Sequence, residues 1–245
     1  MHSVAQLLER FEQLCGPMKP DQLELLLPRQ CWAAVEVLAV DAVGISVLLE
    51  GQMRVPLGAS SEDATVAERL QFTLGEGPCL HAFTQARPVL VGDVADPASV
   101  AWSTWPVYAQ QLLAHTPFVA VFALPLTSAG MTIGTLSLYR RRVGAIDPTD
   151  LGDALAVTNA IFDNLLQTGT FGGADGSASR WLDLPLAKTR TVVWQAMGMA
   201  TVELAQDPAD ALALLRSYAY GNNRLLDDVA ADIVAGRLPL HQLHP

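Results

Sequence analysis

A polar, glycine-rich segment at residues 168–179 constrains the fold of this chain more than any other feature. Its sequence, TGTFGGADGSAS, contains four glycines and a single large apolar residue. Such a composition is typical of flexible connectors, because it offers little apolar surface to bury. We therefore expect the 245-residue chain to divide into a larger unit at residues 1–168, a linker at 169–180 and a smaller unit at 181–245.

The overall composition favours packed domains over disorder. Hydrophobic residues make up 51% of the chain and charged residues 16%, so a sizeable core can form. Cys15, Cys31 and Cys79 are scattered and odd in number, which favours a reducing cytoplasm over a disulfide framework. No apolar run is long enough to cross a bilayer, and charged residues interrupt the N-terminal segment early. We expect a soluble, cytoplasmic protein with no membrane association.

The charge of the chain is acidic overall but is unevenly distributed. The formal net charge is −10, which argues against a nucleic-acid partner for the chain as a whole. Residues 180–245 hold six basic and seven acidic residues and therefore carry a net charge of only −1. Nucleic-acid binding by this part is permitted by its charge but is not required by it.

Hydrophobic patterning in the larger unit predicts an α+β domain. Runs rich in β-branched residues predict strands at 43–49, 53–58, 89–91, 118–125 and 131–140. Helical periodicity predicts helices at 31–38, 64–72, 79–85, 106–114 and 151–166. The last two strands are joined by a short glycine-containing connector, which favours an antiparallel hairpin. The expected architecture is an antiparallel sheet flanked by helices.

A further helix is predicted before this domain, at residues 4–15. Its apolar residues recur at positions i, i+3, i+4 and i+7, so one face is apolar, and Gly16-Pro17 ends the pattern. A helix of this length is marginal alone. Its apolar face therefore packs either on the main domain or on a second copy of the chain.

Several motifs in the larger unit resemble those of GAF domains. They are residues 74–80 (LGEGPCL), 88–94 (PVLVGDV), 123–126 (ALPL) and 133–139 (IGTLSLY), in this order. The resemblance covers roughly residues 30–168. It implies an antiparallel sheet whose loops enclose a small-molecule pocket, and a role as a signal input or dimerisation unit. GAF domains bind cyclic nucleotides, haem, small metabolites or nothing, so the resemblance names no ligand.

Candidate ligand-binding residues in this domain are Cys79, Trp102 and Trp105. A thiolate near the imidazole of His81 would be reactive, and some GAF domains reduce methionine sulfoxide through cysteines. The alternative is that Cys79 is a small core residue. The two tryptophans line a pocket by stacking or pack in the core or an interface. If Cys79 is instead reactive, the chain would be a GAF-based redox or ligand sensor, which stays an alternative function.

The remaining titratable residues do not suggest catalysis. The five histidines are dispersed and lack the close Cys/His spacing of zinc sites. No pair of carboxylates stands out as an acid–base pair. We therefore expect no catalytic residue, no metal and no cofactor, and a protein that is not an enzyme.

The smaller unit has the pattern of three short helices. They are predicted at residues 185–204, 208–221 and 226–236, and Asp207-Pro208 forms a helix start because aspartate caps and proline suits the first turn. Gly198 lies in the middle of the first helix, where glycine costs about 1 kcal/mol relative to alanine. Either a tight helix crossing or the close approach of a partner must offset that cost.

These helices resemble the ANTAR domain, an RNA-binding output module of bacterial regulators. The matching residues include Gln195-Ala196-x-Gly198-Met199, Leu215-Arg216 and Val229-Ala230, and the resemblance covers most of residues 181–241. One departure is Met197, where many ANTAR domains carry Lys or Arg. Single-stranded loops are what proteins read in structured RNA. Candidate RNA-binding residues are Lys188, Arg190, Gln195, Gly198, Arg216, Tyr220, Asn222, Asn223 and Arg224.

The resemblances together imply a regulator that binds tandem RNA hairpins and controls transcription termination. Two hairpins suit a homodimer, since two copies supply two equivalent surfaces. The alternative is a protein-interaction or dimerisation regulator that does not bind RNA, which the near-neutral charge and Met197 favour.

Overall fold

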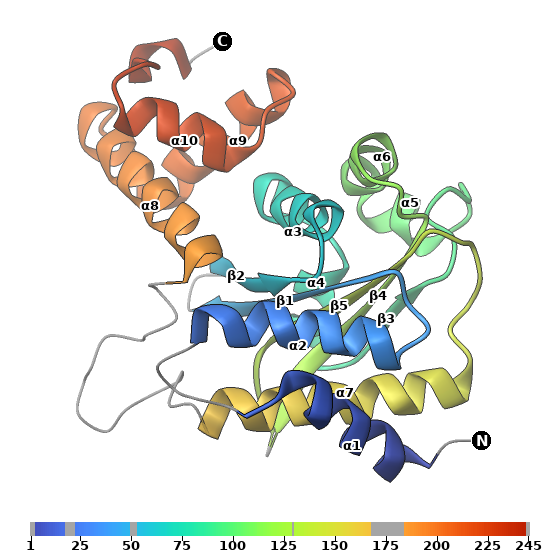
Figure 1. The fold of residues 1–245 in the computed structure, drawn as a ribbon. Coiled ribbons are helices and arrows are strands. Elements are labelled where there is room, and N and C mark those ends of the chain that lie inside the picture. Colours follow the sequence, from blue (N-terminus) through green and yellow to red (C-terminus); the bar gives the residue numbers. More distant parts are fainter. Residues whose placement is uncertain (1–2, 18–22, 50–52, 129, 168–183, 244–245) are drawn as a thin grey trace.

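The fold of the chain is described from a computed structural model (Figure 1), which describes residues 3–17, 23–49, 53–128, 130–167 and 184–243. Its architecture is α+β, with an antiparallel five-stranded sheet, helices on both faces of the sheet, and a helical C-terminal region. The linker predicted at residues 169–180 lies outside the described residues. Its exact boundaries therefore stay a prediction.

The sheet has the strand order β2-β1-β5-β4-β3, and every neighbouring pair is antiparallel. All five strands lie where the sequence pattern predicts them. Alternate residues of the central strands face opposite sides, as the period of two requires. The strands are β1 (Ala42–Leu49), β2 (Met53–Ala59), β3 (Val89–Val91), β4 (Ala120–Ser128) and β5 (Met131–Arg140).

One face of the sheet is covered by α1 (Val4–Cys15), α2 (Leu23–Val37) and α7 (Pro148–Gln167) (Figure 1). The core beneath these helices is aliphatic and includes Ile45 and Leu138 of the sheet. The apolar face of α1 is buried in this same core, against α2 and α7. Helix α1 therefore packs on the main domain of its own chain, which was one of the two alternatives, the other being a second copy of the chain.

The opposite face carries α3 (Glu62–Leu74), α4 (Pro78–Gln85), α5 (Val100–Thr104) and α6 (Pro106–His115). Helix α3 is buried on nearly all sides, and its sequence is accordingly only weakly amphipathic. From Ala67 to Thr73 only Arg69 is more than slightly exposed. A helix covered all round must have partners besides the sheet, and these are α6 and the C-terminal region.

Two parts of this domain differ from the sequence-based expectation. Helix α2 begins at Leu23 and contains Pro28, whereas the pattern predicted a helix only from residue 31. Proline is locally unfavourable inside a helix, but burial of Leu26 and Leu27 stabilises the extra turns around Pro28. The five-residue helix α5 was not predicted, because it is too short to show periodicity.

The C-terminal region contains α8 (Pro185–Glu203), α9 (Pro208–Gly221), α10 (Leu226–Val234) and a short 3₁₀ helix at Leu240–Leu243. Three helices were predicted here, and residues 184–243 contain three α-helices. The Asp207 side chain caps α9 by accepting from the backbone N–H groups of Ala209 and Asp210, both at 2.9 Å. The core of this region also contains Phe72, which comes from α3.

Candidate functional site

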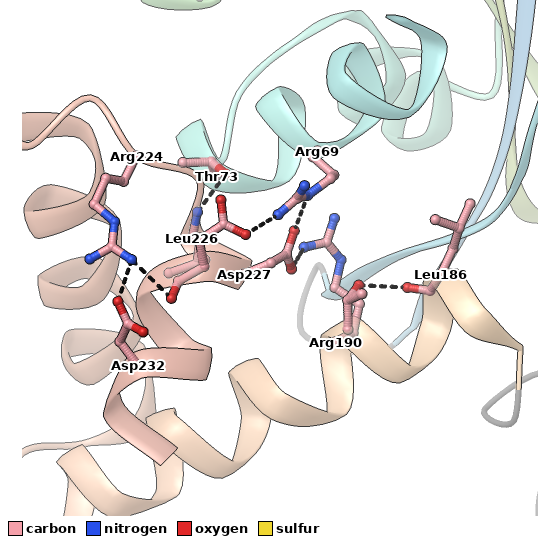
Figure 2. A network of polar contacts seen from close by, with 10 residues as sticks. Arg69, Thr73, Leu186, Arg190, Arg224, Leu226, Asp227 and Asp232 are labelled. Carbon is pink, nitrogen blue, oxygen red and sulfur yellow. Dashed lines mark hydrogen bonds and ion pairs between the residues drawn. The ribbon is translucent and has the colours of Figure 1, made fainter. Parts of the chain in front are cut away.

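The candidate functional site is the seam where α3 meets the three C-terminal helices (Figure 2). We define the seam by the α3 residues Arg69, Phe72 and Thr73 and by their partners in the C-terminal region. The partners are Arg190, Arg216, Leu226, Asp227 and Asp228. Figure 2 labels Arg190, Leu226 and Asp227 of this set. Each partner lies more than 110 residues away from α3 in the sequence, so only the tertiary fold brings them together.

The first turn of α10 provides the polar half of the seam. Arg69 Nε donates to Asp227 Oδ2 at 2.7 Å, and Arg69 Nη2 donates to Asp228 Oδ1 at 2.6 Å. Thr73 Oγ1 accepts from the backbone N–H of Leu226 at 3.1 Å. Helix N-termini leave such N–H groups without partners inside the helix. Helix α3 therefore supplies both a capping hydroxyl for α10 and a cation for its acidic first turn.

Phe72 provides the apolar half. It is only 3% exposed, and the guanidinium carbon of Arg190 lies 3.7 Å from the centroid of its ring. The guanidinium carbon of Arg216 lies 5.5 Å from the same centroid, and Arg216 Nε donates to the Phe72 carbonyl at 3.2 Å. A desolvated cation–π contact such as that of Arg190 contributes about 2 kcal/mol or more.

Arg190 is the most buried cation of the seam. Its side chain is 0% exposed and forms an ion pair with Asp227, which is 4% exposed. Burial lowers the pKa of Arg190 to about 10, and the Asp227 carboxylate opposes that shift. The guanidinium thus stays charged at neutral pH. In this conformation Arg190 has no surface to offer an RNA, contrary to what its place in the sequence predicted.

Arg216 is likewise engaged within the chain. Burial lowers its pKa, and its guanidinium lies against the turn that follows α3. That turn has Gly75 in the left-handed conformation (φ +70°), where a Cβ would lie 2.7 Å from Arg216 Nη1. Gly75 is therefore required both for the φ angle and for the approach of Arg216. Arg216 is partly buried, and its guanidinium is engaged with Phe72 in the seam.

Three of the predicted RNA-binding residues share one exposed face of α8. Lys188, Gln195 and Gly198 are all exposed, and they recur at helical spacing. A Cβ added at Gly198 would have no atom of the described residues within 4 Å. A tight helix crossing within the chain therefore does not explain this glycine, at least among those residues. The alternative, the close approach of a partner, stays a prediction.

The same face of α8 is also apolar towards its C-terminal end. Val202 is 84% exposed and Met199 is 41% exposed. Large apolar side chains with this much exposure on one helix face are typical of interaction surfaces when they are contiguous.

The other predicted RNA-binding residues lie at the C-terminal end of α9 and in the turn that joins it to α10. Tyr220, Asn222 and Asn223 are exposed, and Asn223 has a left-handed backbone (φ +50°). Arg224 is about one-third exposed, and its Nη2 donates to Asp232 at 2.5 Å. Arg224 and Arg237 together lower the pKa of Asp232.

Cys79 lies in the interior of the GAF-like domain, at the start of α4. Its side chain is 0% exposed, its Sγ accepts from Gln71 Nε2 at 3.0 Å, and its backbone N–H donates to Gln71 Oε1 at 3.0 Å. Burial raises the pKa of the thiol even though Arg54 opposes the shift. A neutral, covered thiol is a poor nucleophile. The geometry favours the core role that the sequence left open.

The two tryptophans are held by hydrogen bonds in the same region. Trp102 Nε1 donates to the Val94 carbonyl at 2.8 Å, and Trp105 Nε1 donates to His81 Nδ1 at 3.0 Å. Trp105 is 3% exposed and packs in the core between α5, α6 and the sheet. Neither contact requires a ligand, so both residues have a structural explanation.

Neither a metal site nor a membrane span is found in the part of the chain that the structure describes. Its His, Cys, Asp and Glu residues form no group of three or more that could hold a metal ion. Its helices include none long and apolar enough to cross a bilayer.

The domain built on the β2-β1-β5-β4-β3 sheet matches a known family. The family model described as GAF domain matches residues 22–152 of the chain. The chain therefore belongs to the GAF domain family. A search of curated proteins gives no match.

Solved structures with a similar fold include GAF domains from two phosphotransferases. The domain from the phosphoenolpyruvate-protein phosphotransferase of Coxiella burnetii has a TM-score of 0.52 at 14% identity, covering 67% of this chain and 93% of that chain. The corresponding Acinetobacter domain has a TM-score of 0.49 at 11% identity, covering 70% and 100%. A free methionine-R-sulfoxide reductase from Thermoplasma acidophilum has a TM-score of 0.43 at 16% identity, covering 61% and 96%. Likeness at this level concerns the fold alone, which hosts enzymes and other proteins.

Sequence reasoning missed the α3 half of the seam. Arg69, Phe72 and Thr73 gave no signal beyond a helical pattern, because their partners lie far away along the chain. The one available signal was that α3 has apolar residues on more than one face, which is typical of a helix buried between two partners.

Proposed function

We propose that this chain is a regulator that binds structured RNA through its C-terminal helices. The RNA would be a pair of tandem hairpins, and the consequence would be control of transcription termination. The GAF domain would act as the signal input and would hold the C-terminal helices through the seam. The resemblance of residues 181–241 to ANTAR domains supports RNA as the partner.

The observation that carries the proposal is the open Gly198 on the exposed face of α8. Its backbone is accessible, and Lys188 and Gln195 flank it on the N-terminal side. A lysine supplies a phosphate contact, and a glutamine amide supplies donors and acceptors for a base edge. Arg190 and Arg216 are not part of this surface, since both are engaged in the seam.

The test is a mobility shift with tandem hairpins at moderate salt. The intact chain should shift the RNA at micromolar protein or below. Gln195→Ala should weaken binding about tenfold, because a lost base contact costs about 1–3 kcal/mol. Gln110→Ala, at an exposed glutamine on α6, is the matched control and should leave the affinity unchanged.

Salt titration gives a second readout on the same surface. Lys188→Ala should reduce the slope of log K against log salt by about one, because one phosphate contact is lost. If correctly folded, dimeric protein does not shift the hairpin RNA at micromolar concentrations, the RNA proposal is wrong.

A second candidate function is protein–protein interaction through the same helix. The exposure of Val202 and Met199 favours this function, since their aliphatic side chains offer RNA neither a hydrogen bond nor a charge. Val202→Glu distinguishes the two. If the face is a protein interface, the Val202→Glu variant should lose self-association or partner binding. If the face binds RNA instead, the variant should only weaken RNA binding, through charge repulsion.

A further inference from the structure

We propose that a cavity at the edge of the seam binds an uncharged, planar heterocycle with an amide-type edge, the chemistry of a nucleobase. The cavity lies between α3, α6 and the turn that joins α9 to α10, and has a volume of about 350 Å³. Small-molecule sites typically measure about 300–1,000 Å³ and often lie where two structural units meet. This site is distinct from the interior of the GAF domain, where Cys79 lies.

The apolar walls of the cavity suit a flat ring. Val66, Leu70 and Leu74 of α3 line one side, and Leu225 lines the other. Tyr220 also lines the cavity, with 47% of its surface exposed. An aromatic ring that borders a cavity and is half-exposed provides a face on which a planar heterocycle can stack.

Two side-chain amides supply polar recognition. Gln111 lines the cavity from α6 and Asn223 lines it from the turn. Among the residues that the structure describes, neither amide has a hydrogen-bond partner. Asn and Gln amides pair with the adjacent donor and acceptor of a base edge through two hydrogen bonds. The cavity thus offers amides from both structural units to one small molecule.

The charges around the cavity are compensated within the protein. Asp228 is paired with Arg69, and Arg224 is paired with Asp232. A phosphate or carboxylate entering the cavity would compete with these ion pairs without gaining an unpaired cation. The surroundings therefore favour an uncharged ligand over an anion. His115 of α6 also lines the cavity, and its imidazole provides ring nitrogens.

Occupation of the cavity would affect both structural units. A molecule that contacts α3, α6 and the turn before α10 binds only while these elements are together, so it stabilises the seam. Tyr220, Asn223 and Arg224 are also among the residues predicted to contact RNA. A bound base should therefore compete with RNA at this turn. This second consequence rests on the proposed function, whereas binding of the base does not.

The experiment is calorimetric titration of the full chain with adenine, hypoxanthine and uracil. At least one base should bind with a 1:1 stoichiometry per chain and raise the melting temperature. Asn223→Gly and Gln111→Leu should each weaken binding about tenfold, since each removes one amide pairing. Asn223→Gly keeps the left-handed backbone, so folding is preserved. Gln110→Leu is the matched control, one residue from Gln111 but outside the cavity, and should bind like the unmodified chain.

Three results would overturn the proposal. They are no binding of any of the three bases at about 1 mM by folded protein, binding that neither cavity variant alters, and equal binding of benzoate, a flat anion without an amide edge. The hairpin mobility shift on the same preparation separates the two proposals. An intact RNA shift without base binding removes only the cavity proposal, and base binding without an RNA shift removes only the RNA proposal.

Discussion

Arg54 and Glu68 form an ion pair in the interior of the GAF domain, with both side chains 1% exposed. Glu68 also accepts from Ser46 Oγ at 3.0 Å and from Tyr139 OH at 2.6 Å. Gly44 makes room for this carboxylate, because a Cβ there would lie 2.6 Å from Glu68 Cδ. The network fills the space between the sheet and α3 with polar side chains.

Removing one partner of this pair should be more damaging than removing both. Glu68→Leu alone should lower the free energy of unfolding by about 3–5 kcal/mol, because it leaves Arg54 buried and unpaired. Adding Arg54→Met should recover most of that loss, since an apolar pair of similar size replaces the two charges. Urea denaturation of both variants measures the difference.

Asp63→Ala provides the comparison for an exposed pair. Asp63 pairs with Arg141, both are well exposed, and its loss should change stability by less than about 1 kcal/mol. A Glu68→Leu variant no less stable than Asp63→Ala would contradict the account of the buried pair.

Single residues differed in how far the sequence disclosed them. The Asp207 cap was predicted, because a cap and its helix are neighbours in the sequence. Arg190 was assigned to an exposed surface, and its burial against Asp227 and Phe72 could not be anticipated. Arg190 and Asp227 are 37 residues apart, so no local sequence pattern indicates that they pair. The candidate site was therefore predicted on α8 and the α9–α10 turn, but not at the seam.

At the scale of the element, α8 combines two different faces. Its inner face packs Val193, Ala196 and Ala200 into the C-terminal core, and its outer face carries the open glycine. The small inner residues explain why α8 lies close to its neighbours. The outer glycine is unfavourable for the helix and has no packing explanation among the described residues. Stability and function should therefore respond in opposite directions to its replacement.

Gly198→Ala should raise the free energy of unfolding by up to about 1 kcal/mol, because alanine is the better helix former and a Cβ meets no neighbour. It should also weaken the partner that approaches this backbone, measured as a higher Kd for the hairpin RNA. Gly152→Ala in α7 is the matched control, since it too is exposed with no atom of the described residues within 4 Å. It should stabilise the chain to a similar extent and leave the Kd unchanged. Equal Kd values for both variants would contradict a contact at Gly198.

The elements themselves were largely predictable, and their limits were not. The strands either alternate apolar and polar residues or are apolar throughout, and the longer helices have a clear helical periodicity. All five strands and the longer helices were therefore located. The first turns of α2 were missed, since a helix was predicted only from residue 31 and the proline within these turns is locally unfavourable in a helix. Burial of the flanking leucines outweighs that local preference, and it is a tertiary effect.

For the whole molecule, the seam joins the GAF domain and the C-terminal helices into one packed body. Phe72 belongs to the sequence of one unit and the core of the other. Its carbonyl and ring together engage two arginines, and its neighbours cap α10. Because these contacts span the boundary, the two units should unfold together in the intact chain.

Phe72→Ala should separate them. Calorimetry of the intact chain should give one transition, and the variant should give two, with the C-terminal helices melting first. The expected loss of stability is about 3–5 kcal/mol, as for other buried aromatic residues. Asp63→Ala lies on the same helix outside the seam and should keep the single transition. Two transitions in the unmodified chain would contradict the coupling.

Helix α3 has one further consequence, which concerns its length. Glu68 and Gln71 face the interior of the GAF domain, while Arg69 and Thr73 face the C-terminal helices. Inserting or deleting one residue upstream would rotate everything beyond it by about 100°. That rotation would misplace both sets of contacts at once, and no repacking on one side could correct the other. The 13 residues between the Ser61 cap and Gly75 are thus fixed in number, and natural variation here should take the form of substitution and never of length.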